Sequence, residues 1–154
     1  MSVPSPARAW KTRAWAASPH PRANADAFAP GGWFRSGDIA SVDARGHYRI
    51  LDRLKDMFIS GGENVYPAEV EAALFAHPSI AEAAVIGVPD DRWGEVGRAF
   101  VVAAPGCEVR PGELRGFLAE RLAGYQIPAH FTVLPELPHT ASNKVRESEL
   151  RRLD

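Results

Sequence analysis

Cysteine is almost absent from this sequence, and neither sign of charge dominates it. The single cysteine, Cys107, excludes an internal disulfide and fits a reducing compartment, so we expect a cytoplasmic protein. The formal net charge is −1 at pH 7, whereas chains that bind nucleic acids or membrane surfaces usually carry a marked basic excess. No run of about 18 apolar residues occurs, which excludes a helix that spans a bilayer. Any binding chemistry must therefore come from local groups of residues.

The chain is long enough for one hydrophobic core. Its 154 residues lie near the commonest domain size, and 45% hydrophobic with 24% charged residues is ordinary for a globular protein. The first thirty residues differ, because proline and alanine dominate them and such a composition is a poor basis for a packed element. We expect residues 1–24 to be a disordered lead. A transit peptide is the alternative, although the prolines would break its amphipathic helix.

Two β-hairpins are expected after the lead. The first turns through Asp43-Ala44-Arg45-Gly46 and the second through Ser60-Gly61-Gly62, each between short apolar or alternating runs. The four expected strands are residues 39–42, 48–51, 56–59 and 63–66. Paired glycines leave a bare backbone that a ligand can approach closely, but by themselves they are also an ordinary hairpin turn.

Helical and strand patterns alternate through the rest of the chain. Pro67 is suited to the first residue of a helix that His77-Pro78 ends, and a second helix begins at Pro111 and ends by Gly124. The remaining expected elements are strands at 80–88, 98–104 and 131–134 and a short helix at 147–153. This order predicts an α+β fold, in which a small mixed sheet with packed helices is preceded by β-hairpins.

Three side chains are candidates for nucleotide chemistry. Lys144 ends a turn-rich loop, from which a mobile ammonium group could reach phosphate oxygens in a neighbouring site; the alternative is a solvated surface lysine. Asp38 could accept the two hydroxyls of a ribose, or bond to the backbone of its own turn. Arg53 could bond a ribose or phosphate oxygen, or form a surface ion pair with a neighbouring aspartate.

Taken together, four ordered blocks resemble the C-terminal portion of acyl-CoA synthetases, which are members of the adenylate-forming (AMP-binding) enzyme superfamily. The resemblance runs from about Ala25 to Arg152. The blocks are Gly32 to Asp38, Asp52 to Asp56 with Ser60 to Asn64, Gly87 to Asp90 with Trp93 to Glu95, and Leu137 to Lys144. Four blocks in order at plausible spacing are far more specific than any one of them.

The resemblance implies a two-step ligase. A carboxylic acid substrate attacks the α-phosphate of ATP to give an acyl-adenylate and pyrophosphate, and the thiol of coenzyme A then displaces AMP. ATP or AMP and coenzyme A would be shared with an N-terminal domain, and no Mg²⁺ would be bound by this portion. Within the family, an adenylation domain that loads a carrier protein is the alternative.

The resemblance also implies roles for individual residues. Lys144 would stabilise negative charge during adenylation. Asp38 would bind the ribose hydroxyls with assistance from Arg53, and Lys55 would be the hinge about which the C-terminal domain rotates between the two half-reactions. After rotation the Gly61-Gly62 turn would face the active site, where Gly62 would line the thiol tunnel.

Three departures from the family pattern stand out. The Ser/Thr/Gly-rich phosphate loop is missing, because the paired glycines at 31–32 and 61–62 do not form a phosphate cradle. Asn143 stands where glycine is usual before the lysine, and asparagine tolerates a left-handed backbone better than most residues. His139 stands where arginine is common.

We therefore expect a remnant of the adenylation domain at residues 25–52 and a C-terminal lid domain at residues 53–154. Such a chain would be inactive without an N-terminal adenylation domain, which another chain could supply in trans. A non-catalytic regulatory module and a truncated remnant are the alternatives.

Overall fold

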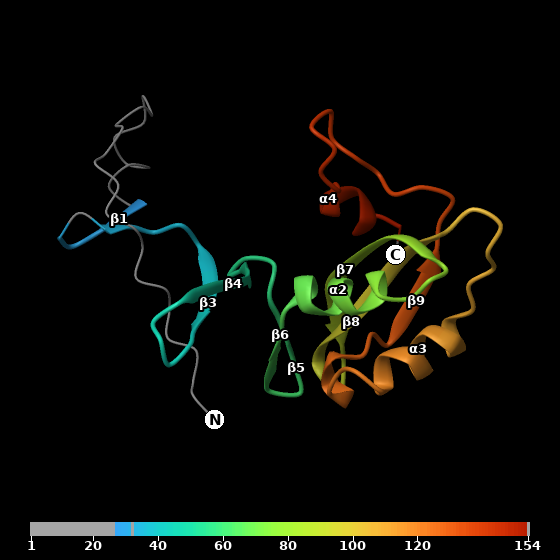
Figure 1. Cartoon of the computed structure of the whole chain (residues 1–154), viewed down its shortest axis with the longest axis horizontal. Helices are drawn as coiled ribbons and strands as arrows, with labels where there is room; N and C mark the ends of the chain where they lie inside the picture. The colour runs from blue at the N-terminus through green and yellow to red at the C-terminus, as the bar shows by residue number, and fades with distance from the viewer. Residues whose placement is uncertain (1–26, 32, 154) are drawn as a thin grey trace. The chain divides into compact units, whose positions relative to one another are not determined.

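The computed structural model describes residues 27–31 and 33–153 (Figure 1). The expected disordered lead, residues 1–24, lies outside the described residues. The chain divides into two compact units, of which the first ends at Lys55 and the second begins at Asp56. Within the described ranges, no helix combines the length and the apolar character that crossing a membrane requires.

The N-terminal unit contains two antiparallel pairs of short strands. β1 (Phe28–Ala29) pairs with β2 (Trp33–Phe34), a pair that the sequence pattern did not reveal. β3 (Asp38–Val42) pairs with β4 (Tyr48–Arg53), which confirms the first predicted hairpin.

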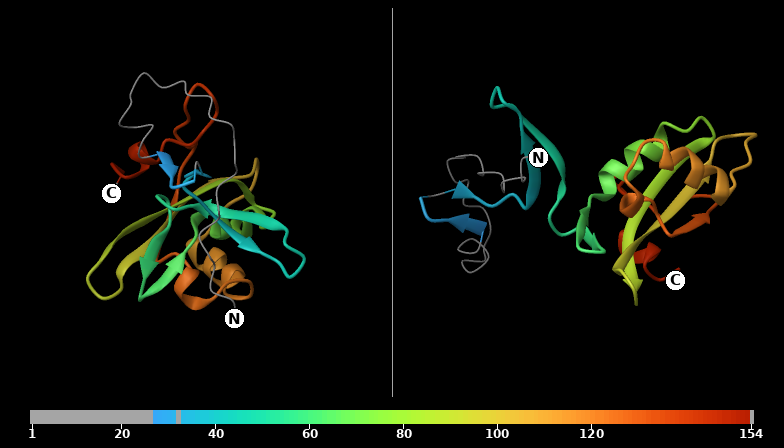
Figure 2. Two further views of the ribbon diagram at one scale, coloured as in Figure 1. Left: turned by 90° about the vertical axis from the view of Figure 1, so that its left-hand side faces the viewer. Right: turned by 90° about the horizontal axis from the view of Figure 1, so that it is seen from below.

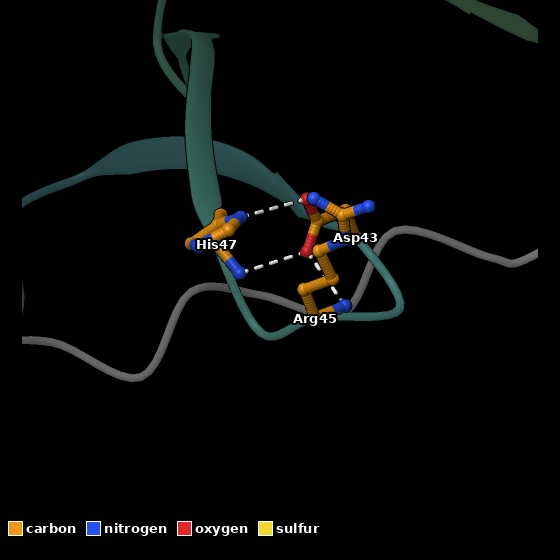
Figure 3. A network of polar contacts seen from close by, with 3 residues as sticks. All are labelled: Asp43, Arg45 and His47. Carbon is orange, nitrogen blue, oxygen red and sulfur yellow. Dashed lines mark hydrogen bonds and ion pairs between the residues drawn. The ribbon is translucent and has the colours of Figure 1, made fainter.

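The β3–β4 turn depends on the carboxylate of Asp43 (Figure 3). Its Oδ1 accepts the backbone N–H groups of Arg45 at 2.8 Å and His47 at 2.9 Å, and its Oδ2 lies 3.0 Å from Nδ1 of His47. Gly46 takes the left-handed position with φ 84°. Hydrogen bonds to the charged form, above all the one from the backbone of His47, lower the pKa of the Asp43 carboxyl.

The C-terminal unit is built on a five-stranded mixed sheet. Its strands are β5 (Phe58–Ser60), β6 (Glu63–Val65), β7 (Ile80–Asp90), β8 (Gly94–Ala103) and β9 (His130–Val133). The order β6-β5-β8-β7 is antiparallel, and β9 adds to β8 in parallel. The predicted mixed sheet is therefore confirmed.

β7 and β8 are longer than the sequence suggested. The segment between residues 88 and 98 was expected to be a loop, but most of it is strand. The reason is a tight turn that Asp90 closes, because its Oδ1 accepts the N–H groups of Arg92 at 2.9 Å and Trp93 at 2.8 Å. This turn keeps the two strands paired almost to their ends.

Three helices and one 3₁₀ turn complete the C-terminal unit as it is described. The helices are α2 (Pro67–Phe75), α3 (Pro111–Ala119) and α4 (Glu147–Leu150), and the 3₁₀ turn is Gly124–Gln126. Proline begins both α2 and α3, as predicted. α4 is shorter than the expected helix at 147–153, because residues 151 and 152 form a turn.

Each face of the sheet carries its own core cluster. Residues of β7 alternate between the two, so that Val85 packs under α2 and α3, whereas Ile86 packs with Leu137 and Leu150 on the opposite face. The right-hand view of Figure 2 shows α2 and α3 on one side of the sheet and α4 on the other. The β9–α4 connection, residues 134–146, contributes Leu137 to the cluster on the α4 side, and its residues Leu134 and Val145 pack against that cluster.

β7 lies at an edge of the sheet, and side chains protect that edge. Oε1 of Glu71 accepts the outward N–H of Val85 at 2.9 Å, and Nη1 of Arg151 donates to the outward carbonyl of Gly87 at 2.9 Å. Pro89 is the next residue of β7 whose backbone faces outward, and proline has no N–H that would need a partner. Covered edges of this kind resist pairing with a second chain.

Candidate functional site

Lys144 lies directly after a three-residue hairpin loop. Thr140 and Lys144 flank the loop, and the N–H of Thr140 donates to the carbonyl of Lys144 at 2.7 Å. The N–H of Asn143 donates to the carbonyl of Thr140 at 2.9 Å, and the N–H of Lys144 donates to Oγ1 of Thr140 at 3.1 Å. His139 and Val145 form a bridge one residue further out. The β3–β4 turn has the same hydrogen-bond pattern, with Asp43 in place of Thr140.

Asn143 occupies the left-handed position of this loop. Its φ is 60°, and no other non-glycine residue in the described part of the chain has a positive φ. Asparagine adopts this conformation more readily than other residues with a Cβ. The departure from glycine at this position is therefore compatible with a well-formed hairpin.

The Lys144 side chain is exposed. Its neighbour Val145 packs against the core cluster that contains Leu137 and Leu150, and successive residues of an extended segment point to opposite faces. Lys144 therefore projects from the outer face of the hairpin, where a ligand from outside the C-terminal unit can reach it.

The β3–β4 pairing brings Asp38 and Arg53 together. They are direct cross-strand partners, and Nε of Arg53 lies 3.9 Å from Oδ1 of Asp38. Arg53 also lines a pocket of about 370 Å³ together with Ser36, Gly37, Leu54 and Lys55. The two expected ribose ligands and the expected hinge residue thus lie next to one another in the N-terminal unit.

The Gly61-Gly62 turn joins β5 and β6 by a two-residue loop in which both φ angles are positive, 60° and 87°. The two glycines have different surroundings. A Cβ on Gly61 would lie 2.8 Å from Cε3 of Trp93, whereas a Cβ on Gly62 would meet nothing within 4 Å. The N–H of Gly61 also donates to the carbonyl of Trp93 at 2.9 Å, so Gly61 attaches the turn to the sheet and Gly62 faces open space.

A pocket of about 380 Å³ lies beside this turn. Its lining includes Ser60, Gly61, Trp93, Arg115 and Tyr125. The two aromatic side chains are 48% and 42% exposed, so they offer ring surface to a ligand. Sequence reasoning missed Tyr125, because nothing in the local pattern distinguishes it from a core aromatic.

The glycine turn and the Lys144 hairpin lie at opposite ends of the C-terminal unit. Figure 1 shows the β5–β6 turn at the bottom of this unit and the β9–α4 connection at its top, and the left-hand view of Figure 2 preserves the separation. The C-terminal unit therefore presents two separate surfaces. Among the described residues, no group of three or more His, Cys, Asp or Glu side chains is arranged to hold a metal ion.

This fold and these turns define the C-terminal domain of an adenylate-forming enzyme. Residues 69–144 match the family model of the AMP-binding enzyme C-terminal domain, and the chain belongs to this family.

Known relatives agree with this assignment. A feruloyl-CoA synthase from an Amycolatopsis species is 54% identical over 121 residues, which are 79% of this chain and 25% of that protein. A fatty acid–[acyl-carrier-protein] ligase from Streptomyces coeruleorubidus is 48% identical over 78% of this chain and 23% of its own length. The o-succinylbenzoate CoA synthetase of Bacillus subtilis, solved with an acyl-adenylate intermediate, superposes with a TM-score of 0.81 at 46% identity, covering 86% of this chain and 27% of that chain. The chain thus spans about a quarter of the length of these relatives.

Proposed function

We propose that this chain is the lid of an acyl-CoA ligase, in which Lys144 serves adenylation and the Gly61-Gly62 turn serves thioester formation. The observation that carries the proposal is the placement of Lys144 on the outer face of a hydrogen-bonded hairpin, exposed, in a domain of the AMP-binding enzyme family. A carboxylic acid, ATP and coenzyme A would be the reactants, with the nucleotide bound chiefly by an N-terminal adenylation domain, supplied in trans where it is a separate chain.

In the first half-reaction a carboxylate oxygen of the acid attacks the α-phosphorus of ATP, and pyrophosphate leaves. Lys144 is suited to this step because an ammonium group held by a rigid backbone stabilises the negative charge that develops on the phosphate oxygens. Three hydrogen bonds close its loop, which restricts the backbone conformations open to Lys144.

In the second half-reaction the sulfur of a thiol attacks the acyl carbon, and AMP leaves. Gly62 is suited to lie beside the part of the substrate that carries the thiol, because a glycine has no side chain and the space next to it is open. The neighbouring pocket with Trp93 and Tyr125 could hold a further part of the thiol substrate.

The separation of the two surfaces supports alternation between them. Surfaces at opposite ends of one rigid unit cannot both face the same nucleotide, so the unit must rotate between the half-reactions. Lys55 is the last residue before the C-terminal unit, and a change in its backbone torsions would turn the whole unit. Asp38 and Arg53, which precede Lys55 by seventeen and two residues, would bind the ribose.

The acceptor could also be a carrier protein rather than coenzyme A. One relative, 48% identical to this chain, is a fatty acid–[acyl-carrier-protein] ligase. A regulatory module without catalytic residues is a separate alternative. Its action would not depend on the Lys144 side chain.

A half-reaction assay tests the proposal. The chain is combined with the isolated N-terminal adenylation domain of a relative, and acid-dependent pyrophosphate release is measured. K144A should lower this rate by about 10²- to 10³-fold, yet leave thioester formation from a supplied acyl-adenylate intact. R110A, which removes an exposed cation on another loop, serves as the control. No rate gain over the adenylation domain alone would refute the proposal, and an unaffected K144A rate would favour the regulatory module.

A further inference from the structure

The base of the Lys144 hairpin carries a histidine–carboxylate contact that reaches across to the sheet. Nε2 of His139 lies 3.2 Å from Oε2 of Glu82 on β7. Both side chains are partly buried, with 27% exposure for the histidine and 40% for the glutamate. His139 is also one of the positions at which the sequence departs from its family.

The hairpin has an inner and an outer face, and the two residues lie on the inner one. His139 and Val145 are cross-strand partners, so their side chains share a face. Val145 packs against the core cluster on the α4 side of the sheet, whose members include Ala84 and Ile86 of β7. Glu82 precedes Ala84 by two positions and therefore points to this side of the sheet.

Contacts other than this one also hold the hairpin segment in place. Leu137 and Leu150 are buried at the two ends of the segment that contains the hairpin, and the N–H of Arg146 donates to the carbonyl of Pro138 at 2.8 Å. These contacts hold the segment on the sheet. The His139–Glu82 contact joins the base of the loop to β7, so it can set how closely the hairpin approaches this strand and thereby where Lys144 lies on the outer face.

We propose that His139 and Glu82 form a positioning pair that fixes the hairpin against β7 and so orients Lys144 for adenylation. This inference rests on the proposed function of Lys144. Neither residue touches the reactants: both act through the backbone of the hairpin. A small displacement of the ammonium group weakens its electrostatic effect, because catalysis depends on the geometry of charged groups.

The test measures the two half-reactions separately in the complex with an adenylation domain. H139Q and E82Q should each lower adenylation by about twofold to fivefold, the range that a partly exposed polar contact can support. The double variant should be no worse than either single one. Thioester formation from a supplied acyl-adenylate should be unchanged. H139R should keep the wild-type rate with Glu82 present and lose it in the E82Q background. E108Q, which breaks the exposed pair of Glu108 with Arg110, is the matched control.

Amide hydrogen exchange of the chain provides a readout that needs no activity. In E82Q and H139Q, exchange should quicken at residues 139–145 and stay unchanged in β8. Equal loss of both half-reactions together with a lower melting temperature would overturn the inference in favour of a merely structural role. Unchanged adenylation in H139Q and E82Q would also overturn it, provided that K144A abolishes the step. If K144A has no effect either, the proposed function itself fails.

Discussion

Asn143 holds the left-handed position of the Lys144 hairpin, and replacing it by valine should weaken that hairpin. At φ 60° the Cβ of an ordinary L-residue crowds the following carbonyl oxygen. The cost is about 1–2 kcal/mol, and a β-branched side chain belongs at the upper end of this range. Glycine meets no such crowding, so N143G should differ from the wild type by less than about 0.5 kcal/mol.

Urea unfolding of N143V, N143G and the wild type provides the measurement. The midpoint should fall for N143V with the slope unchanged, since the buried area stays the same. A loss of about 1–2 kcal/mol corresponds to about a 5- to 30-fold change in the ratio of folded to unfolded molecules. Adenylation should fall in parallel, because Lys144 is the next residue.

The β3–β4 turn offers the matched control. Gly46 holds the same left-handed position there, with φ 84°. G46N should be tolerated and G46V should destabilise its hairpin, but neither should affect the Lys144 hairpin. Wild-type stability of N143V, or marked destabilisation by N143G, would refute the reasoning from backbone strain.

Three further predictions follow from single contacts. G61A should destabilise by about 1–3 kcal/mol more than G62A, because only the first places a methyl group against the indole below the turn; thermal unfolding of both variants decides this. E71A should cost about 1–3 kcal/mol by leaving the N–H of Val85 without its acceptor, whereas E71Q keeps an acceptor oxygen and should cost less in urea unfolding. The lowered pKa of Asp43 stabilises the fold at pH values above the ordinary 3.8, and this contribution disappears as the pH falls through the lower folded pKa. D43N should therefore make the β3–β4 hairpin less sensitive to acid. NMR titration of the Asp43 carboxyl carbon in the wild type measures the pKa directly, and an ordinary pKa would contradict this prediction.

The order of the elements was largely predictable, because local chemistry marks their ends. Proline begins α2 and α3, and glycine pairs or Asx-type residues mark the turns of both predicted hairpins. The length of β7 and β8 was not predictable. It depends on one aspartate side chain that closes a tight turn, and the same residues read locally as a loop.

The candidate site, too, was predictable from the sequence only in part. Pattern resemblance selected Lys144, Asp38, Arg53 and the two glycines, because residue type and spacing are properties of the chain itself. The pairing of Asp38 with Arg53 needed the strand register, and the difference between Gly61 and Gly62 needed the position of an indole ring.

By itself, then, the sequence determined the family, the element order and the turns, since these follow from backbone preferences that act over a few residues. Only the tertiary structure decided that the lysine hairpin and the glycine turn lie at opposite ends of one unit, and that His139 meets Glu82 on β7. These facts depend on how the sheet packs against its helices and loops, which brings together residues that are far apart in the chain and have no local signal of their own.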